Sequence, residues 1–508
     1  MLVSGEPQEQ SEAVLKDAPP AASEPNGEEC VSGGRLGLLM LALVLCMFLV
    51  ALDMTIVTTA IPRITQEFNS LDDIGWYGSA FFLTISAFSQ VWGKAYTYYS
   101  LKFVILAAIF VFEAGSLICG VAQDSRTLII GRAVTGAGGA GITNGCYTII
   151  AFIAEPKKRP AYTGILGATY GIASVIGPLI GGAFTTNATW RWCFYMNLPV
   201  GFLSACVLVF FFQPPPSAAP RKASTMDKLR NMDPVGTALI LASLVCFLLV
   251  MQWGGVSKPW SSADVIGTLV GFVLIMMLFA VHQTWLGETA MMVPRLVTNR
   301  RVFFLALFNF FLAGSFFNFV YYLPIYFQAI GGYSASASAV RNLPLILGSS
   351  VATIAGGAAL PLVGYFNLYL LGGSALAIVG GGFMLTLTTV MEMAKCVGFQ
   401  LLLGVGAGLC IQIPVAVGQG FAEPADIAAT TAVLLFFQTM GGTIFISAAQ
   451  SIFTNKLPEV LAAYLSGLRN AWILGVVCAG LSLLSGLSLR YQTIHDMKET
   501  AHQKDAEA

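Results

Sequence analysis

Charged side chains are scarce in this 508-residue chain: only 10% of it is Asp, Glu, Lys or Arg, whereas a soluble domain has about 25%. The three histidines are too few for a His-rich metal site, and the chain has no GxxxxGKS/T, HExxH or GxSxG motif. These absences predict a protein that is not an enzyme, does not hydrolyse ATP and holds no metal or cofactor. The 26 basic and 26 acidic residues balance, so the net charge gives no reason to expect nucleic acid as a partner.

Apolar residues are abundant instead and make up 56% of the chain. They form fourteen runs of roughly 20 residues, the length of a helix that crosses a bilayer, without the short alternating segments of a membrane β-barrel. We therefore predict an all-α polytopic membrane protein with 14 transmembrane helices, at 36–59, 75–97, 102–121, 127–152, 161–184, 193–212, 234–252, 264–284, 302–326, 336–360, 366–390, 397–420, 427–453 and 470–489.

The cysteines and the ends of the chain carry less information. The ten cysteines lie mostly inside the apolar runs and lack a metal-like CxxC spacing, so they are interpreted as small packing residues. Residues 1–35 are polar and acidic, which predicts a disordered cytoplasmic tail and no cleavable signal peptide. A second cytoplasmic tail is expected at 490–508.

The longest polar interruption, residues 213–233, reads QPPPSAAPRKASTMDKLRNMD and has the composition of a flexible linker. Basic residues gather in the loops on one side of the predicted helices, which places both termini and this linker in the cytoplasm. On the outer side, Asn187-Ala-Thr189 matches a glycosylation sequon, although its short loop lies close to the membrane. The basic loop residues are Lys94, Lys102, Lys157, Lys158, Arg159, Arg221, Lys222, Lys228, Arg230, Arg295, Arg300 and Arg301.

Residues 170–184, YGIASVIGPLIGGAF, place glycine and proline inside a membrane-length apolar run, although these residues weaken a soluble helix by roughly 1 and 3 kcal/mol. On a helical wheel the small residues form one stripe, where they let two backbones approach closely, and the proline bends the helix. The stripe predicts a conformational interface on which another helix packs and slides; a static GxxxG-type dimer face is the alternative. Its members are Gly167, Gly171, Ser174, Gly177, Pro178, Gly181 and Gly182.

This stretch resembles the antiporter motif in helix 5 of the major facilitator superfamily, within its fourteen-helix branch of drug:proton antiporters. LDMTIVTTAIPRI (52–64) is similar to the helix 1 motif of that branch, and LIIGRAVTGAGGAG (128–141) to its helix 4 motif with a central arginine. WRWCFYMNLPVG (190–201), QWGG with WSS (252–262) and YYLPIYFQAIGGYSASASAVRNLP (321–344) look like fungal toxin and multidrug efflux pumps. The resemblance covers residues 36–490.

The resemblance implies a major facilitator fold of two six-helix bundles, 36–212 and 302–489, with two inserted helices and a following loop at 234–301. A repeated glycine pattern, TGAGGAG (135–141) and GVGAGL (404–409), agrees with related halves. The family also implies alternating access and proton-coupled efflux of a hydrophobic small molecule: a fungal secondary metabolite, toxin or drug. We expect a monomeric, multi-pass protein of the plasma membrane, with the vacuolar membrane as the alternative.

One predicted cytoplasmic loop departs from the family pattern. The loop between helices 2 and 3 commonly resembles G-x-L-a-D-r-x-G-r-k, but here it reads GKAYTYYSLK (93–102), without the aspartate and the second glycine. The charge latch attributed to that loop is therefore in doubt here. Lys94 and Lys102 are instead candidates for contact with lipid headgroups or helix ends.

Few ionisable groups lie inside the predicted helices, and burying one near the bilayer centre costs at least about 2.5 kcal/mol, so each is a functional candidate. Asp53 and Arg132 both fall in the outer half of the membrane, where they could meet directly or through water. An arginine favours the ionised form of a nearby carboxylate, whereas separation or desolvation favours the protonated form. Asp53 is thus the first candidate for the proton carrier and Glu113 the second, and a pair that only fixes helix packing is the alternative. His282 is expected to be solvated near the cytoplasmic boundary.

The substrate-binding candidates are polar side chains in otherwise apolar helices. The predicted ninth helix is rich in aromatic residues, half or more of which are expected to face lipid, but amides are costly to leave in hydrocarbon. Together, the aromatic residues and the amides predict a cavity that is mostly apolar with a few hydrogen-bonding groups. Such a cavity suits a bulky, uncharged or weakly charged organic molecule rather than a sugar or a strongly cationic compound. The candidates are Asn309, Asn318, Tyr326, Gln412 and Gln438.

Two other functions stay open on the same sequence. A proton-coupled importer of a small organic molecule or an iron chelate would share the fold, and only the family association of the glycine-proline motif argues against it. A transport-inactive receptor or a membrane-embedded enzyme is disfavoured because Asp53 and Arg132 are present and no catalytic constellation is found.

Overall fold

The structure, a computed structural model, describes residues 33–70, 73–255, 257–388, 392–455 and 461–489. The two predicted tails, apart from residues 33–35, lie outside the described residues. Every regular element in the described residues is helical, and one isolated β-bridge joins Gly254 and Lys258. The prediction of an all-α protein is confirmed.

The helices follow the predicted runs closely. In chain order they are α2 (Gly33–Phe68), α3 (Ile74–Tyr98), α4 (Leu101–Val121), α5 (Ser125–Ile153), α6 (Arg159–Asn187), α7 (Trp192–Tyr195), α8 (Asn197–Phe211), η2 (Pro216–Ala218), α9 (Thr225–Asn231), α10 (Pro234–Trp253), α11 (Ala263–Leu286), η3 (Gly287–Thr289), α12 (Pro294–Thr298), α13 (Arg300–Ala329), α14 (Ala335–Arg341), α15 (Leu343–Val363), α16 (Phe366–Met384), α17 (Met393–Ile411), α18 (Ile413–Phe421), η4 (Pro424–Asp426), α19 (Ile427–Thr454) and α20 (Leu461–Leu487).

Twelve helical segments of the described residues are long and apolar enough to cross a membrane. Helices α3 and α5 are not among them, although they have 25 and 29 residues. Both carry many glycine, serine and threonine residues, and most of α5 is buried against other helices rather than at the surface. The number of 14 transmembrane helices is therefore not confirmed, because two of the predicted helices are too polar to qualify by composition.

Two predicted helices are interrupted. The predicted helix at 397–420 divides into α17 and α18 at Gln412, since Pro414 lacks the N–H that would continue the backbone ladder. The predicted helix at 193–212 divides into α7 and α8, with Pro199 in the first turn of α8. The linker at 213–233 is partly helical, because Ser224 caps α9 by accepting from the Asp227 N–H at 3.2 Å.

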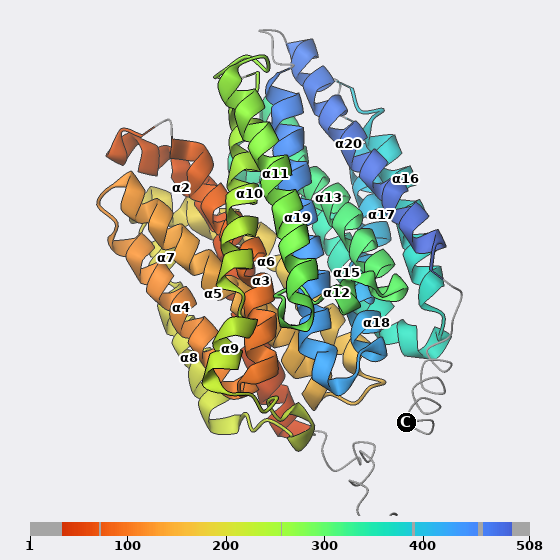
Figure 1. The fold of residues 1–508 in the computed structure, drawn as a ribbon. Helices are drawn as coiled ribbons and strands as arrows, with labels where there is room; N and C mark the ends of the chain where they lie inside the picture. Colours follow the sequence, from red (N-terminus) through yellow and green to blue (C-terminus); the bar gives the residue numbers. More distant parts are fainter. Residues whose placement is uncertain (1–32, 71–72, 256, 389–391, 456–460, 490–508) are drawn as a thin grey trace, which may run out of the picture.

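The helices pack in two groups (Figure 1). In residues 33–211, α2 packs against α6, and α3 and α4 pack against α5. In residues 300–487, α13 packs against α19 and α20, and α17 packs against α15 and α16. The groups meet where α6 contacts α15 and where α3 contacts α19, and α10 lies against both α3 and α19 with α11 beside it. The start of α2 and the end of α20 lie at one end of the molecule, the predicted cytoplasmic end (Figure 1).

Glycines permit the close packing inside each group. A Cβ on Gly138 of α5 would lie 2.6 Å from the Phe112 Cα of α4, and one on Gly404 of α17 would meet the Leu345 backbone of α15. The outward faces are apolar instead: α11 exposes Val270, Leu274 and Trp285, among others. Small residues between helices and large apolar residues outside are the pattern of a bundle that lies in lipid.

Candidate functional site

A buried ion pair lies inside the first helix group. Arg132 of α5 and Asp53 of α2 are both fully buried, and Arg132 Nη1 contacts Asp53 Oδ2. Arg132 Nε donates to the Tyr77 carbonyl at 2.9 Å, and its guanidinium lies 4.5 Å from the centre of the Phe81 ring. The structure thus brings together the two residues that the sequence pairs, by direct contact.

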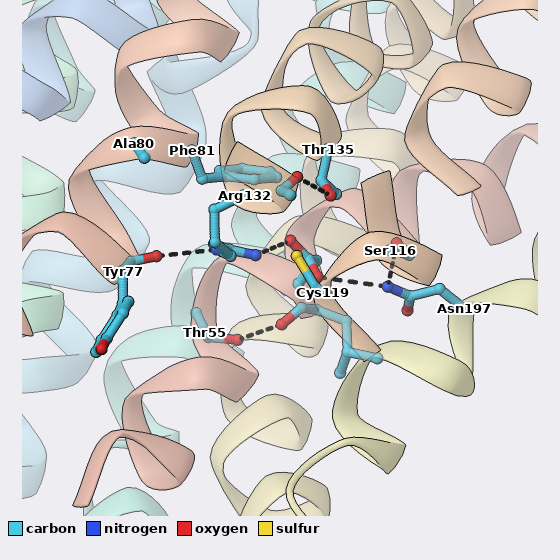
Figure 2. Close-up of polar contacts among 12 residues, drawn as sticks. Thr55, Tyr77, Ala80, Phe81, Ser116, Cys119, Arg132, Thr135 and Asn197 are labelled. Atoms are coloured by element: carbon cyan, nitrogen blue, oxygen red, sulfur yellow. Dashed lines mark hydrogen bonds and ion pairs between the residues drawn. The ribbon is translucent and has the colours of Figure 1, made fainter. Parts of the chain in front are cut away.

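A second helix pair completes the surroundings of Asp53. Asn197, the first residue of α8, donates through Nδ2 to Asp53 Oδ1 at 3.3 Å and to Ser116 Oγ of α4 at 3.1 Å. Figure 2 shows Arg132 between Tyr77 on one side and the Asn197–Ser116 contact on the other. Sequence reasoning missed Asn197, although a fully buried amide in an apolar helix carries the same signal as Asn309 and Asn318.

Glu113 lies one helical turn from Ser116 on α4 and does not join this network. Both of its carboxyl oxygens are buried and lack a hydrogen-bond partner in the described structure. Its Oε1 lies where a Cβ of Gly201 would be, so the carboxyl group packs directly against the backbone of α8. Glu113 therefore faces a packed neighbour, and its role as a proton carrier stays a prediction.

The small-residue stripe of α6 serves two different neighbours. A Cβ on Gly177 or Gly181 would collide with Thr55 or Thr59 of α2, whereas one on Gly171 would lie 2.6 Å from Ser350 Oγ of α15. A Cβ on Gly167 would lie 2.6 Å from Gln412 Cγ, and Gly182 has open space. The stripe therefore packs within the first group at the outer end of α6 and against the second group toward its predicted cytoplasmic end. Ser174 bonds the Gly171 carbonyl at 2.6 Å, and α6 continues through Pro178.

A cavity lies between the two groups of helices. It has a volume of about 70 Å³, enough for a few water molecules. No Asp, Glu, Lys, Arg or His of the described chain lines it. Its wall includes Met47, Met54, Phe82, Thr143, Tyr147, Gly167, Tyr170, Gly171, Phe316, Phe317, Thr353, Gln412, Gln438 and Thr439.

Only two of the five substrate-binding candidates, Gln412 and Gln438, lie in this wall. Asn309 Nδ2 donates to the Leu434 carbonyl at 3.3 Å and Asn318 Nδ2 to the Ala471 carbonyl at 3.0 Å. The Tyr326 hydroxyl donates to the Thr388 carbonyl at 2.8 Å. These last three residues do not line this cavity in the described structure, where each polar group joins α13 to a neighbouring segment, and their part in substrate binding stays a prediction.

The amide and hydroxyl groups in the cavity wall are not all paired. Gln412 Oε1 and Thr143 Oγ1 are buried and have no hydrogen-bond partner in the described structure. Thr143 and the aromatic residues Tyr147, Tyr170 and Phe317 do not stand out in the sequence. No sequence signal separates them from ordinary packing residues, since the wall forms only when the two groups meet.

Basic and acidic residues form a cluster at the predicted cytoplasmic end. Asp426, which is 8% exposed, pairs with Arg221 of the linker at 3.5 Å and with Arg295 of α12 at 2.9 Å. Arg295 also pairs with Glu288 at 3.0 Å, and the bonds from Glu288 and Asp426 raise the pKa of Arg295 above its ordinary value. We call Arg221, Glu288, Arg295 and Asp426 the cytoplasmic cluster.

Two lysines and a histidine near this end also contact groups on neighbouring helices. Lys94 Nζ donates to the Glu288 carbonyl at 3.1 Å and Lys102 Nζ to the Val209 carbonyl at 2.6 Å, so both contact the ends of helices as the sequence suggested. The expectation for His282 is wrong: it is largely buried, and its Nε2 lies 2.9 Å from Asp233 Oδ1. Asp233 meets His282 because it caps the start of α10, and α10 lies beside α11, which carries His282.

The predicted outer end has its own polar cluster. Glu67, near the end of α2, accepts from Trp190 Nε1 at 2.7 Å and pairs with Arg191 at 2.9 Å. The Trp190 bond, followed by that from Arg191, holds the pKa of Glu67 below its ordinary value. Arg191 also donates to the Ala122 carbonyl at 2.8 Å, so the WRW stretch joins α2 to the end of α4. Asn187 is exposed at the end of α6, and its modification stays a prediction.

Comparison with solved structures finds the same fold in proteins of low sequence identity. The human organic anion transporter MFSD10 superposes with a TM-score of 0.62 at 13% identity, over 90% of this chain and 100% of that one. A bacterial homologue of the human lysosomal transporter Spinster, in an inward-facing and unoccupied conformation, gives a TM-score of 0.54 at 17% identity, over 90% and 98%.

Comparison with curated proteins finds much nearer relatives, among them three from fungi. An MFS-type transporter of Pestalotiopsis microspora is 47% identical over 462 residues, covering 90% of this chain and 84% of that protein. An MFS-type efflux pump of Arthroderma benhamiae is 38% identical over 501 residues (92% and 94%), and an efflux pump of Penicillium rubens is 40% identical over 495 residues (91% and 92%). The sequence profile of the Major Facilitator Superfamily matches residues 43–446 of this chain. The chain therefore belongs to the major facilitator superfamily and is a multi-pass membrane transporter of small molecules, not an enzyme.

Proposed function

We propose that this protein exports a bulky, uncharged and mostly hydrophobic organic molecule in exchange for protons. The observation that carries the proposal is the placement of two neighbouring residues on α2. Asp53 belongs to the buried pair with Arg132, and Met54 belongs to the wall of the uncharged cavity. One helix thus contacts both a candidate proton site and a candidate substrate site. The names of the relatives from Arthroderma benhamiae and Penicillium rubens, both efflux pumps, support the direction of transport.

The substrate class follows from the cavity wall. Methionine and phenylalanine side chains offer apolar contact, and the absence of charged residues in the described wall disfavours a charged ligand. The unpaired Gln412 Oε1 can accept a hydrogen bond and the Thr143 hydroxyl can donate or accept one. A fungal secondary metabolite, toxin or drug with a hydroxyl or amide on an apolar body would satisfy these groups.

Substrate entry requires the two groups of helices to separate, because the cavity of about 70 Å³ holds only a few water molecules. We propose that residues 36–212 and 302–489 rock as two six-helix bundles, with 234–301 as two inserted helices and a following loop. In this scheme α3 and α5 also cross the membrane and make fourteen crossing helices. The glycines at the α6–α15 contact let these helices shift against each other with little steric resistance.

We propose that the buried pair of Asp53 and Arg132 couples transport to protons. Burial favours the protonated form of Asp53 and contact with Arg132 favours the ionised form, so a movement that separates the pair promotes protonation. Alternation between the two arrangements would take up a proton on one side of the membrane and release it on the other. We further propose that the protein works as a monomer in the plasma membrane, the site from which efflux leaves the cell.

The test is gradient-dependent flux in reconstituted vesicles, with a panel of hydrophobic fluorescent dyes, for the wild type and Asp53→Asn. We expect flux that collapses with the proton gradient in the wild type and is at least tenfold lower in the variant. Asp264→Asn is the matched control, because Asp264 is exposed and pairs only with Lys258 at the surface. Net uptake rather than efflux would identify an importer, and ligand-induced signalling without flux would identify a receptor.

A further inference from the structure

Beyond this pair, the first group of helices contains an acidic group without a charge partner. The Glu113 side chain of α4 lies against Gly201 of α8 and near Asp53 of α2. Neither carboxyl oxygen is reached by solvent or by a hydrogen-bond donor in the described structure. An ionised carboxylate that is buried without a partner carries a penalty of several kcal/mol, which the protonated form avoids.

The neighbours of Glu113 offer no positive charge. Helix α8 presents Gly201 and, one turn on either side, Asn197 and Ser204, none of which titrates. Helix α2 contributes Asp53 and Cys46, which add negative charge when ionised. Arg132 of α5 is the one nearby cation in the described helices, and it is committed to Asp53, Tyr77 and the Phe81 ring.

Polar side chains that bond Asp53 come within one helical turn of Glu113 along α4, although Glu113 itself makes no hydrogen bond to them in the described structure. Ser116 lies one turn from Glu113 on α4, and its hydroxyl accepts from Asn197, which also donates to Asp53. Because helix α4 runs from the predicted cytoplasmic end outward, Glu113 lies about 4.5 Å closer to the cytoplasm than Ser116. Glu113 therefore lies on the cytoplasmic side of the Ser116–Asn197 contact that reaches Asp53.

We propose that Glu113 is a second proton-binding residue, which holds the transported proton in this conformation while Asp53 remains ionised against Arg132. When Arg132 withdraws from Asp53, the proton passes from the Glu113 carboxylic acid to the Asp53 carboxylate, leaving Glu113 ionised and Asp53 neutral. The net charge of the pair of acids does not change in this step. The inference rests on the proposed proton coupling and adds a store for the proton within the first bundle, outside the substrate cavity.

The experiment is infrared spectroscopy of the protein in lipid membranes at neutral pH, since a protonated carboxyl has a carbonyl stretch that a carboxylate lacks. We expect such a band in the wild type and in Asp53→Asn, and its loss in Glu113→Gln. Glu67→Gln is the matched control and should keep the band, because Glu67 lies at the outer surface. A band that survives Glu113→Gln, or disappears only in Asp53→Asn, overturns the proposal. If Glu113→Gln does not fold, Glu113→Asp should shift the band rather than remove it.

Flux measurements on the same variants separate the proposed proton store at Glu113 from the proposed proton-coupled export. We expect Glu113→Gln to reduce gradient-dependent efflux of the dye panel at least tenfold, with the gradient-independent part retained. Loss of the band without any change in gradient dependence would overturn the role of Glu113 as a store. If the wild type itself shows no proton-coupled flux, the proposed function fails, while the infrared result still decides whether Glu113 holds a proton.

Discussion

Charged side chains in this protein have specific partners both in the interior and at the outer surface. Arg132 and Asp53 are buried together, so removing either one leaves an unpaired charge, which typically costs about 3–5 kcal/mol. Glu67 is held at the surface of the outer end by Trp190 and Arg191. The first arrangement is the proposed proton site, whereas the second fixes the end of α2 and can be probed by stability alone.

The pH dependence of stability should report on Glu67. Its pKa is lowered in the folded protein, chiefly by the Trp190 N–H bond, so its stabilising effect is present above the unfolded pKa of about 4.3 and is lost as the pH falls through the folded value. We expect Glu67→Gln to unfold at a lower temperature than the wild type at neutral pH and to lose less stability on acidification. Thermal unfolding in lipid nanodiscs between neutral and acid pH measures this difference.

A matched exposed glutamate provides the comparison. Glu155 pairs only with Lys158 on the surface of a turn, and an exposed pair of this kind contributes little. Glu155→Gln should therefore follow the wild-type curve at every pH. If Glu67→Gln also follows it, the Trp190 and Arg191 bonds do not contribute to the stability of the fold.

At the scale of helices, α6 shows how one stripe of small residues serves two contacts. Its outer glycines pack against α2 inside one bundle, and Gly167 and Gly171 face the other bundle. In the proposed rocking motion only the second contact has to change. Substitutions along the stripe should therefore separate into those that affect folding and those that affect transport.

The neighbours Gly181 and Gly182 give a direct test of the packing role. A Cβ at position 181 would lie 2.6 Å from the Ile56 carbonyl oxygen of α2, whereas one at position 182 meets nothing within 4 Å. We expect Gly181→Ala to destabilise the protein by about 1–3 kcal/mol and Gly182→Ala to leave the unfolding temperature unchanged or slightly higher. Equal effects of the two substitutions on thermal unfolding would show that α2 and α6 do not pack in this way.

The helices and the buried ion pair could be predicted from the sequence because both follow from the cost of polar groups in lipid. Apolar runs predict helices, and the few charges inside them must find each other, as Asp53 and Arg132 do. The same rule does not say which partner Asn309 and Asn318 find, since a buried amide can bond the carbonyl of any adjacent helix. Periodicity identifies a buried face but not which helix covers it, and only the contact between the bundles defines the cavity wall.

Over the whole molecule, contacts at the predicted cytoplasmic end join parts that are distant in sequence. Asp426 receives Arg221 from the linker and Arg295 from the segment after the inserted helices, while Lys94 of the first bundle contacts the Glu288 carbonyl. The loop at 93–102 lacks the acidic residue that the family pattern places there. Asp426, from the second bundle, joins the linker to the segment after the inserted helices at this end, and we expect it to restrain the bundles there.

Asp426→Asn should therefore open the cytoplasmic end. Losing a charged hydrogen bond of about 1.5 kcal/mol changes a two-state equilibrium about tenfold, so a cysteine at Thr353 in the cavity wall should react about tenfold faster with an impermeant thiol reagent applied at that end. The matched control is Asp227→Asn, because Asp227 is an exposed acid of the linker. An unchanged reaction rate in Asp426→Asn would show that the cytoplasmic cluster does not restrain the bundles.

The adjacent positions of Asp53 and Met54 on α2 have a kinetic consequence. Consecutive helical residues point about 100° apart, so the acid faces the interior of its bundle while the thioether faces the cavity. In the proposed mechanism protons and cargo would then occupy different places and need not displace one another. If the proposed antiport holds, acidification should therefore alter the maximal velocity of export more than the cargo concentration that gives half of that velocity.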